Sequence, residues 1–254
     1  MKNAVPLNNT AHKNVKITPR TSFTDVADKN SIALTVDELS AAASSFPIVF
    51  IKDASTGSFH CVALFVFEGT QNLYCSQNNE HWEGVYVPSS MRREPFSLGP
   101  DPDQDKTLMI YIDESSAQFS KTDGNALFAE DGTETGFLKS INAQLSEYFN
   151  SELLSQNFAS TLLEKDLLKE IELLIKFDSE RTKRVKGLYT IDEDALNKLD
   201  EETVLAFFKQ NFFVPIYSML NSITQFNRLL RLHNNVSSEK IVSLNMRAAG
   251  GEKL

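Results

Sequence analysis

The fold is decided by residues 46–69, which read FPIVFIKDASTGSFHCVALFVFEG. This stretch holds two apolar runs, Phe46–Asp53 and Phe59–Gly69, that are rich in the β-branched and aromatic residues favoured in strands. The short segment between the runs contains Gly57, a residue that suits a tight turn. Two strand-like runs joined by a short glycine-containing loop predict a β-hairpin.

More strands are expected on the C-terminal side of this hairpin. Short extended pieces at Leu73–Cys75 and Gly84–Val87 continue the meander across a polar turn. Leu108–Asp113 is apolar at every position before the aspartate, so we expect a central strand with both faces covered. Farther along, Ile171–Phe177 and Val185–Ile191 predict a second, smaller hairpin.

Helical spacing dominates the second half of the chain. Apolar residues recur at helical intervals within residues 135–149 and 151–163, which predicts two helices. Asp192 and Asp200 suit the N-caps of later helices, and Pro215 predicts either a kink or a junction between two helices. Because the predicted strands come first in the sequence and the helices later, we expect an α+β fold. In this fold an antiparallel β-meander in the N-terminal half is packed by C-terminal helices, with a small late hairpin.

The domain organisation expected from the sequence is simple. Residues 1–30 are polar and lack apolar periodicity, so we expect a flexible or loosely docked N-terminal arm. No linker rich in proline or glycine divides the central part, and we expect a single α+β domain over residues 31–235. The polar residues 236–254 are expected to form a C-terminal tail.

Four phenylalanines cluster just before Pro215, namely Phe207, Phe208, Phe212 and Phe213. On a helix these positions spread over more than one face. We expect Phe208 and Phe212 to pack on the sheet. We expect Phe207 or Phe213 to meet another helix or a partner chain.

The composition is that of an acidic globular protein. The chain has 254 residues, of which 41% are hydrophobic and 23% charged, and its net charge is −9. This charge disfavours nonspecific binding of nucleic acid, which depends on Lys and Arg at phosphates, and docking on anionic membranes. No apolar run reaches the roughly 20 residues that span a bilayer, the N-terminus lacks the apolar core of a secretory signal, and two cysteines form no disulfide framework. We therefore expect a cytoplasmic protein that neither inserts into a membrane nor binds nucleic acid.

The candidate binding site lies in Val85–Leu98, which reads VYVPSSMRREPFSL. Arg92 and Arg93 stand side by side between two prolines, and the planar guanidinium group suits a carboxylate or a phosphate. The alternative is an internal ion pair with a carboxylate such as Asp113 or Glu114. Both interpretations remain open at this point.

Aromatic residues near the arginines widen this candidate site. Aromatic groups beside arginine suit the recognition of peptides or indole groups, although filling the core is an equally good interpretation. The predicted ligand-binding residues are Arg92, Arg93, Tyr86, Trp82, Phe96, Asp113 and Glu114.

The sequence carries no complete signature of catalysis or cofactor binding. No phosphate-binding loop or dinucleotide fingerprint occurs, and no serine-nucleophile elbow surrounds Ser89 and Ser90. His60 and Cys61 are neighbours in a predicted strand and point to opposite faces, so at most one of them can join a common metal site. We expect neither a metal nor a cofactor.

Several short motifs resemble, in their order along the chain, those of the bacterial SapC family. They are Phe46–Phe50, Tyr86–Pro88, Arg92–Arg93, Pro95–Phe96, Ile112–Glu114, Leu127–Phe128, Asp131–Gly132, Gly187–Glu193, Ile216–Tyr217 and Arg228–Leu230. The family is named for surface-layer-associated proteins and often carries a peptide-transport label. Its members tend to be encoded beside TonB-dependent receptors, flavin-dependent tryptophan halogenases and cupin-like proteins. The resemblance supplies no catalytic residues.

The resemblance and the residues together imply a cytoplasmic binding or adaptor protein. It is expected to recognise a small anionic or aromatic ligand similar to an amino acid or peptide, or a protein partner, and a homo-oligomer is a further expectation. The alternatives are an enzyme or enzyme subunit acting on amino acids or peptides, and a surface-layer-associated structural protein. A cleft that brings Asp113 or Glu114 to Arg92, Arg93 or His81 would favour the enzyme.

Overall fold

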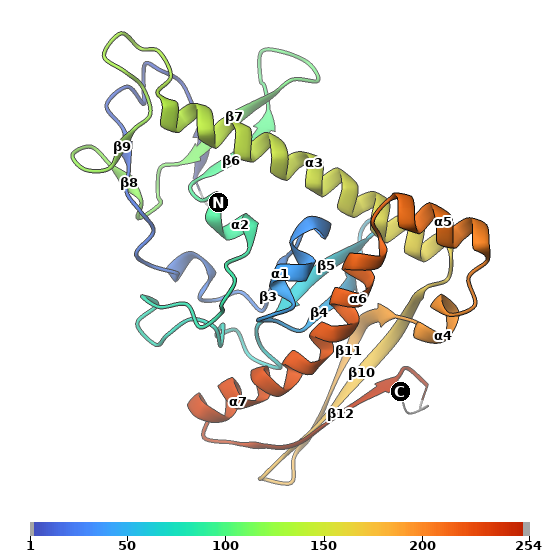
Figure 1. Ribbon diagram of the computed structural model, residues 1–254. Helices are drawn as coiled ribbons and strands as arrows, with labels where there is room; N and C mark the ends of the chain where they lie inside the picture. Colours follow the sequence, from blue (N-terminus) through green and yellow to red (C-terminus); the bar gives the residue numbers. More distant parts are fainter. Residues whose placement is uncertain (1–2, 251–254) are drawn as a thin grey trace. The chain divides into compact units, whose positions relative to one another are not determined.

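A computed structural model describes residues 3–250 and contains both helices and antiparallel sheets (Figure 1), which confirms the predicted α+β class. Backbone contacts group the chain into two compact units. Unit 1 consists of the residues up to Phe23 and Ser89–Ser151, and unit 2 consists of Thr24–Pro88 and the residues from Glu152 onward. A single domain is expected over residues 31–235, but two of the unit boundaries fall inside that range. No linker marks them, because one follows a proline in a loop and the other lies within a helix.

Unit 1 is built on two small antiparallel sheets. The strand order of the first is β1-β7-β6, and that of the second is β8-β2-β9. Their strands are β1 (Ala4–Pro6), β2 (Lys16–Ile17), β6 (Phe96–Pro100), β7 (Leu108–Asp113), β8 (Phe119–Ser120) and β9 (Asn125–Ala126). The unit also contains the short helix α2 (Ser89–Arg92) and the first part of the long helix α3 (Gly136–Glu164).

The N-terminal segment belongs to the folded core of unit 1, in contrast to the flexible arm expected for residues 1–30. β1 pairs with β7, and β2 pairs with β8 and β9. Val15 and Ile17 are buried and cluster with Phe96 and Ile112. Two apolar residues are too few to reveal a strand by periodicity, but they are enough once strands distant in sequence supply the pairing partners.

β7 is the central strand of its sheet, as predicted. The expectation that both its faces are covered is wrong, since Leu108 is 43% exposed and the next three residues are half-buried. The physical reason is that Leu108, Met109 and Ile110 line an open cavity, described below. Only Ile112 and Asp113, at the end of the strand, are buried.

Unit 2 contains a six-stranded antiparallel sheet with the order β12-β10-β11-β4-β5-β3. Its strands are β3 (Ser31–Ala33), β4 (Ile48–Lys52), β5 (Phe59–Leu64), β10 (Leu168–Phe177), β11 (Thr182–Ile191) and β12 (Ile241–Ala248). Both predicted hairpins are confirmed, because β4 pairs with β5 and β10 pairs with β11. The extended pieces expected at Leu73–Cys75 and Gly84–Val87 are loops instead, and Cys75 forms only an isolated bridge, with Trp82.

The C-terminal segment completes this sheet. β12 pairs with β10, and Ile241 and Ala248 are buried. The expectation of a polar tail over residues 236–254 is therefore wrong for Ile241–Ala248, which form β12. Its apolar residues alternate with Ser, Asn and Arg, so the strand appears polar in the sequence although Leu244 and Met246 pack on the core. Residues 251–254 of the expected tail lie outside the described residues.

Helices of unit 2 cover its sheet, and Figure 1 shows α6 and α7 running across one face. Besides the last part of α3, the helices are α1 (Leu39–Ala42), α4 (Glu193–Leu196), α5 (Glu201–Lys209), α6 (Phe213–Ser222) and α7 (Phe226–Val236), with 3-10 turns at Thr24–Val26, Val36–Glu38 and Ile223–Gln225. The predicted caps are confirmed. The carboxylate of Asp192 accepts a hydrogen bond from the backbone N–H of Asp194, and that of Asp200 accepts one from Thr203.

Two helix boundaries depart from or refine the sequence prediction. The helices expected over residues 135–149 and 151–163 form the single helix α3, because the polar residues between them are tolerated inside a helix. α5 and α6 are separate helices, which confirms the junction alternative at Pro215. Asn211, with φ of 56°, lies between them, and Pro215 lies in the first turn of α6, where its missing N–H removes no intrahelical bond.

The phenylalanines around this junction follow the prediction only in part. Phe212 is buried in the core as expected, but Phe208 is 71% exposed, so its predicted packing on the sheet is wrong. The buried face of α5 is set by Thr203 and Phe207, four residues apart, and the next position along the helix turns away from it. Phe207 packs against Phe213, with ring centroids 5.9 Å apart.

Candidate functional site

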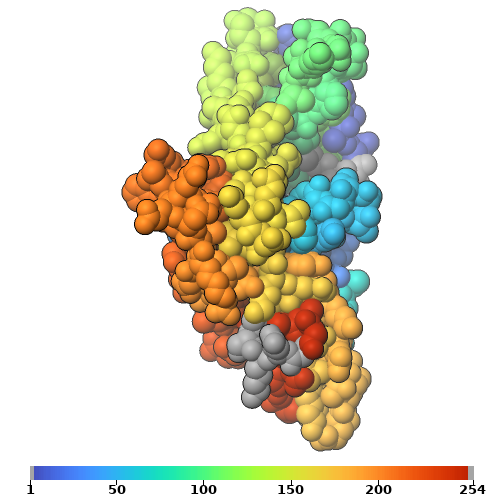
Figure 2. Space-filling view, turned by 90° about the vertical axis from the view of Figure 1, so that its right-hand side faces the viewer, coloured from blue at the N-terminus to red at the C-terminus, as the bar shows by residue number. Residues whose placement is uncertain are grey.

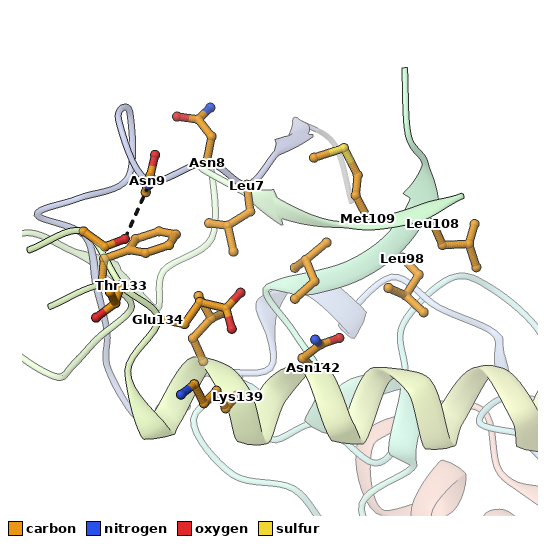
Figure 3. Close-up of a pocket in the computed structure, with 14 residues that line it drawn as sticks. Leu7, Asn8, Asn9, Leu98, Leu108, Met109, Thr133, Glu134, Lys139 and Asn142 are labelled. Atoms are coloured by element: carbon orange, nitrogen blue, oxygen red, sulfur yellow. Dashed lines mark hydrogen bonds between the residues drawn. The ribbon is translucent and has the colours of Figure 1, made fainter. Parts of the chain in front are cut away.

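Unit 1 contains an open cavity of about 640 Å³. It lies between the start of α3 and the strands β6 and β7, and Figure 3 shows the helix on one side and the strands on the other. The lining residues are Leu7, Asn8, Asn9, Leu98, Leu108, Met109, Ile110, Phe128, Gly132, Thr133, Glu134, Leu138, Lys139 and Asn142.

The apolar wall of the cavity is built by strand pairing. Leu98 of β6 is opposite Ile110 of β7. The N–H of Leu7 donates to the carbonyl of Ile110 at 2.8 Å, which extends the β1–β7 pairing to the cavity. On the helix side, Leu138 is buried and closes the base. These side chains therefore come from three parts of the sequence, namely the segment that follows β1, the β6–β7 hairpin and α3.

The polar wall of the cavity is a tight turn that leads into α3. Both the N–H and the hydroxyl of Thr133 donate to Oδ1 of Asp131, at 3.0 and 2.7 Å, and these bonds lower the pKa of the Asp131 carboxyl below its usual value. Gly132 has a φ of 82°, which permits the turn. The hydroxyl of Thr135 donates to the carbonyl of Ala126 at 2.7 Å, and this fixes the start of α3. The direction in which α3 leaves the turn is thereby set.

Two opposite charges lie on this cavity. Glu134 precedes α3 and Lys139 lies in its first turns, and both side chains are exposed. Neither side chain has a hydrogen-bond or ion-pair partner among residues 3–250. Because no protein group neutralises them, both charges are available to a ligand.

The polar and charged side chains of the cavity gather toward one end, where Leu7 also lies. Figure 3 shows Asn9, Thr133, Glu134 and Lys139 toward one end. Leu98, Leu108 and Met109 lie toward the other end, with Asn142 between the two groups. An arrangement of this kind suits a molecule that has charged groups at one end and an apolar group at the other.

The N-terminal wall is stiffened by a compact turn around His12. Oδ1 of Asn8 accepts hydrogen bonds from the N–H groups of Thr10 and Ala11, at 3.1 and 2.7 Å. The ring of His12 is buried, with Nδ1 3.2 Å from the backbone of Asn8. Nε2 of His12 lies 3.3 Å from Oε1 of Glu114, without hydrogen-bond alignment. Glu114, one of the predicted ligand-binding residues, thus lies beside this turn.

The paired arginines occupy the end of α2 and the residue that follows. The Arg92 side chain is exposed. The guanidinium group of Arg93 lies over the ring of Tyr148, 4.4 Å from its centroid, and Nη1 is 3.5 Å from the carbonyl of Phe96. Its buried Nε has no hydrogen-bond partner in the part of the chain that the structure describes. Binding of an anion by these arginines stays a prediction.

Two other predicted residues of unit 1, Phe96 and Asp113, lie on β6 and β7. Phe96 is buried in the core of the unit, opposite Ile112 of β7. Asp113 is buried, and its Oδ1 accepts hydrogen bonds from the N–H and the hydroxyl of Ser115, at 3.0 and 2.5 Å. Unit 1 therefore places Phe96 and Asp113 on the neighbouring strands β6 and β7, with Arg93 just before β6, but none of the seven predicted residues lines the cavity.

Trp82 and Tyr86 belong to unit 2 and pack into its core. The Trp82 ring lies among Phe46, Phe65 and Tyr74, with centroid distances of 5.9, 5.5 and 5.8 Å. Its Nε1 donates to the carbonyl of Tyr86 at 2.8 Å. The hydroxyl of Tyr86 donates to Oε2 of the buried Glu38 at 2.9 Å. These contacts match the alternative that the aromatic residues fill the core.

The residues of the cavity are absent from the predicted site. Two local signals were available, namely the turn at Asp131–Gly132 and the start of a helix near Thr135. What no local pattern could provide is the pairing that brings Leu7–Asn9 and β7 to this turn. The cavity exists only because these segments meet in the folded unit.

The sequence model of the SapC family matches residues 7–229, a range that includes every residue lining the cavity. No curated protein matches the chain, and no solved structure matches it. Across residues 3–250, none of the helices combines the length and apolar character needed to cross a membrane.

Proposed function

The chain belongs to the SapC family, and from that premise we propose that it is a binding protein that holds a small amphipathic ligand in the cavity of unit 1. The observation that carries the proposal is the division of one cavity into a charged end and an apolar end. Its volume of about 640 Å³ is within the range of roughly 300–1,000 Å³ typical of small-molecule sites.

The chemistry of the two ends favours a ligand similar to an amino acid or a short peptide. The ammonium group of Lys139 would pair with a ligand carboxylate, and the carboxylate of Glu134 with a ligand amine. The apolar end, lined by Leu98, Leu108 and Met109, would take an aliphatic or aromatic side chain. In this assignment the anionic group of the ligand is held by Lys139 rather than by Arg92 and Arg93.

Binding is a better description of this site than catalysis. The ionisable side chains that line the cavity are Glu134 and Lys139, and both are exposed on the rim. A general acid or base is normally held in place within hydrogen-bond reach of the reacting group. Exposed rim charges instead suit recognition of a charged ligand by long-range attraction and pairing.

Matched ligands test this assignment by calorimetry. L-tryptophan carries all three groups, indole-3-propionate lacks the amine, and tryptamine lacks the carboxylate. We expect Lys139→Gln to weaken L-tryptophan and indole-3-propionate roughly 10-fold or more, because a hydrogen bond to a charged group contributes about 1.5–3 kcal/mol. The same change should leave tryptamine binding unaltered, and Glu134→Gln should show the opposite preference.

Lys121→Gln is the control, because Lys121 is an exposed lysine of the same unit outside the cavity. It should bind all three ligands as the unchanged chain does. The proposal fails if none of the ligands binds, or if Lys121→Gln and Lys139→Gln have the same effect.

We further infer a cytoplasmic location. The two buried cysteines, Cys61 and Cys75, form no disulfide, which is consistent with a reducing compartment. Cell fractionation with an antibody against the chain tests this inference. Recovery in an extracellular or surface-layer fraction would contradict it.

A further inference from the structure

α5 carries an apolar stripe that points away from the core of unit 2. Val204, Leu205 and Phe208 are 40, 52 and 71% exposed. Together with Glu201 they occupy positions i, i+3, i+4 and i+7, the spacing with which one helix packs along another. The core-facing positions of α5 are Thr203 and Phe207, so the exposed stripe is not needed to hold α5 on its own unit.

A groove accompanies this stripe. It has a volume of about 320 Å³ and is lined by Leu199, Glu201, Val204, Leu205, Phe208 and Phe213. Figure 2 shows the orange segment that contains α5 at the molecular surface. An exposed aromatic side chain beside an apolar groove is typical of a surface that contacts another protein chain.

The charges on α5 determine which partner fits. Glu202 and Lys209 are seven residues, or about two turns, apart and therefore lie on the same flank of the stripe. Neither side chain has a hydrogen-bond or ion-pair partner within the described residues. The helix is thus acidic at its start and basic at its end along one flank.

We propose that α5 pairs in antiparallel fashion with α5 of a second copy of this chain. A two-fold axis near Leu205 places Glu202 of each copy beside Lys209 of the other, so both flanking charges are matched. The same axis turns the exposed Phe208 of each copy toward the groove of the other. A two-fold interface uses the same patch on both chains, and this patch is complementary to itself in charge and in shape.

The pairing should be reversible and concentration-dependent. α5 has nine residues and is about 13 Å long. The contact between two α5 helices is therefore short. Sedimentation velocity of the full chain over a concentration series should show the average mass rising toward that of a dimer. A chain that stays monomeric throughout the series overturns the proposal.

Phe208→Ser tests the apolar contact. We expect the dimer dissociation constant to rise at least 10-fold, while the melting curve stays unchanged because Phe208 is exposed in the single chain. Val85→Ser is the matched control, since Val85 is also exposed, at 82%, and lies in a loop of the same unit. Equal self-association of the two variants overturns the proposal.

A charge exchange tests the antiparallel direction. Lys209→Glu and Glu202→Lys should each weaken self-association, because each places like charges together at both ends of the contact between the two α5 helices. An equimolar mixture of the two variants should form a mixed dimer, since every flanking contact is then between opposite charges. Failure of the mixture to associate more strongly than either variant alone overturns the antiparallel pairing.

Discussion

Gly84 shows how a single residue controls the packing of the aromatic core in unit 2. A Cβ atom at this position would lie 2.5 Å from Nε1 of Trp82 and 2.9 Å from both Cζ of Phe46 and the carbonyl of Tyr86. Side chains in a protein core do not approach so closely, so the loop can pass the aromatic cluster only without a side chain. The absence of a Cβ therefore lets Trp82 donate its hydrogen bond to Tyr86.

We predict that Gly84→Ala destabilises unit 2 by about 1–3 kcal/mol, because the added methyl group must displace the Trp82 ring or the backbone. Urea unfolding followed by Trp82 fluorescence measures the change. Gly136→Ala is the control, since Gly136 opens α3 with no atom within 4 Å of the added group and alanine favours a helix. An unfolding midpoint for Gly84→Ala equal to that of the unchanged chain contradicts the prediction.

At the level of single residues, the sequence predicts local roles well and distant ones poorly. The caps at Asp192 and Asp200 depend on N–H groups within three residues, and both are confirmed. Trp82 depends on Phe46 and Phe65 in other parts of the chain. Composition around Trp82 cannot distinguish an aromatic ring that meets a ligand from one that completes a core.

The same contrast holds for whole elements. The hairpins β4–β5 and β10–β11 are predictable because each strand pairs with its neighbour in the sequence. β1, β2 and β12 pair with strands far along the chain, and their short or mixed apolar patterns carry little signal alone. The cavity of unit 1 depends on one of these pairings, so the predicted site could not include it.

The β10–β11 hairpin is tied to two other segments by Arg181. Nη2 of Arg181 lies 2.7 Å from Oε1 of Glu68, which follows β5, and 2.6 Å from Oε2 of Glu239, which precedes β12. The guanidinium group also lies 3.8 Å from the centroid of the Phe177 ring. The hydrogen bond from Arg181 is the main cause that lowers the pKa of both Glu68 and Glu239.

These lowered pKa values predict a pH dependence of stability. In the unfolded chain both glutamates titrate near their usual pKa of about 4.3. The stabilisation is therefore complete above that pH and is lost as the pH falls through the lower pKa values of the folded state. We expect Arg181→Met to lose less stability between pH 7 and pH 3 than the unchanged chain does.

Urea midpoints at the two pH values measure this difference. Lys176→Met is the control, because Lys176 pairs with the exposed Glu180 at 2.7 Å in the same hairpin but contacts neither Glu68 nor Glu239 by an ion pair. It should lose as much stability in acid as the unchanged chain. If Arg181→Met loses as much stability between pH 7 and pH 3 as the unchanged chain, the ion pairs of Arg181 with Glu68 and Glu239 do not cause this pH dependence.

At the scale of the whole molecule, each unit has its own hydrophobic core. Val15, Ile17, Phe96 and Ile112 belong to the core of unit 1. A separate and larger cluster, with Phe50 among its members, forms the core of unit 2. The chain passes between the units more than once, so each core combines segments from separate parts of the sequence. A search for a linker cannot detect such an arrangement, because the division is created by contacts and not by composition.

The two cores predict that loss of the N-terminal strands affects unit 1 selectively. Deletion of residues 1–23 removes β1, β2, Val15 and Ile17, together with the Leu7–Asn9 wall of the cavity. We expect amide hydrogens of β7 to exchange much faster in the shortened chain, while those of β10 and β11 keep their protection and provide the internal control. L-tryptophan binding should be lost as well. Equal loss of protection in β7 and β10 would mean that the two cores unfold together. Unchanged protection in β7 would mean that the N-terminal strands do not stabilise unit 1.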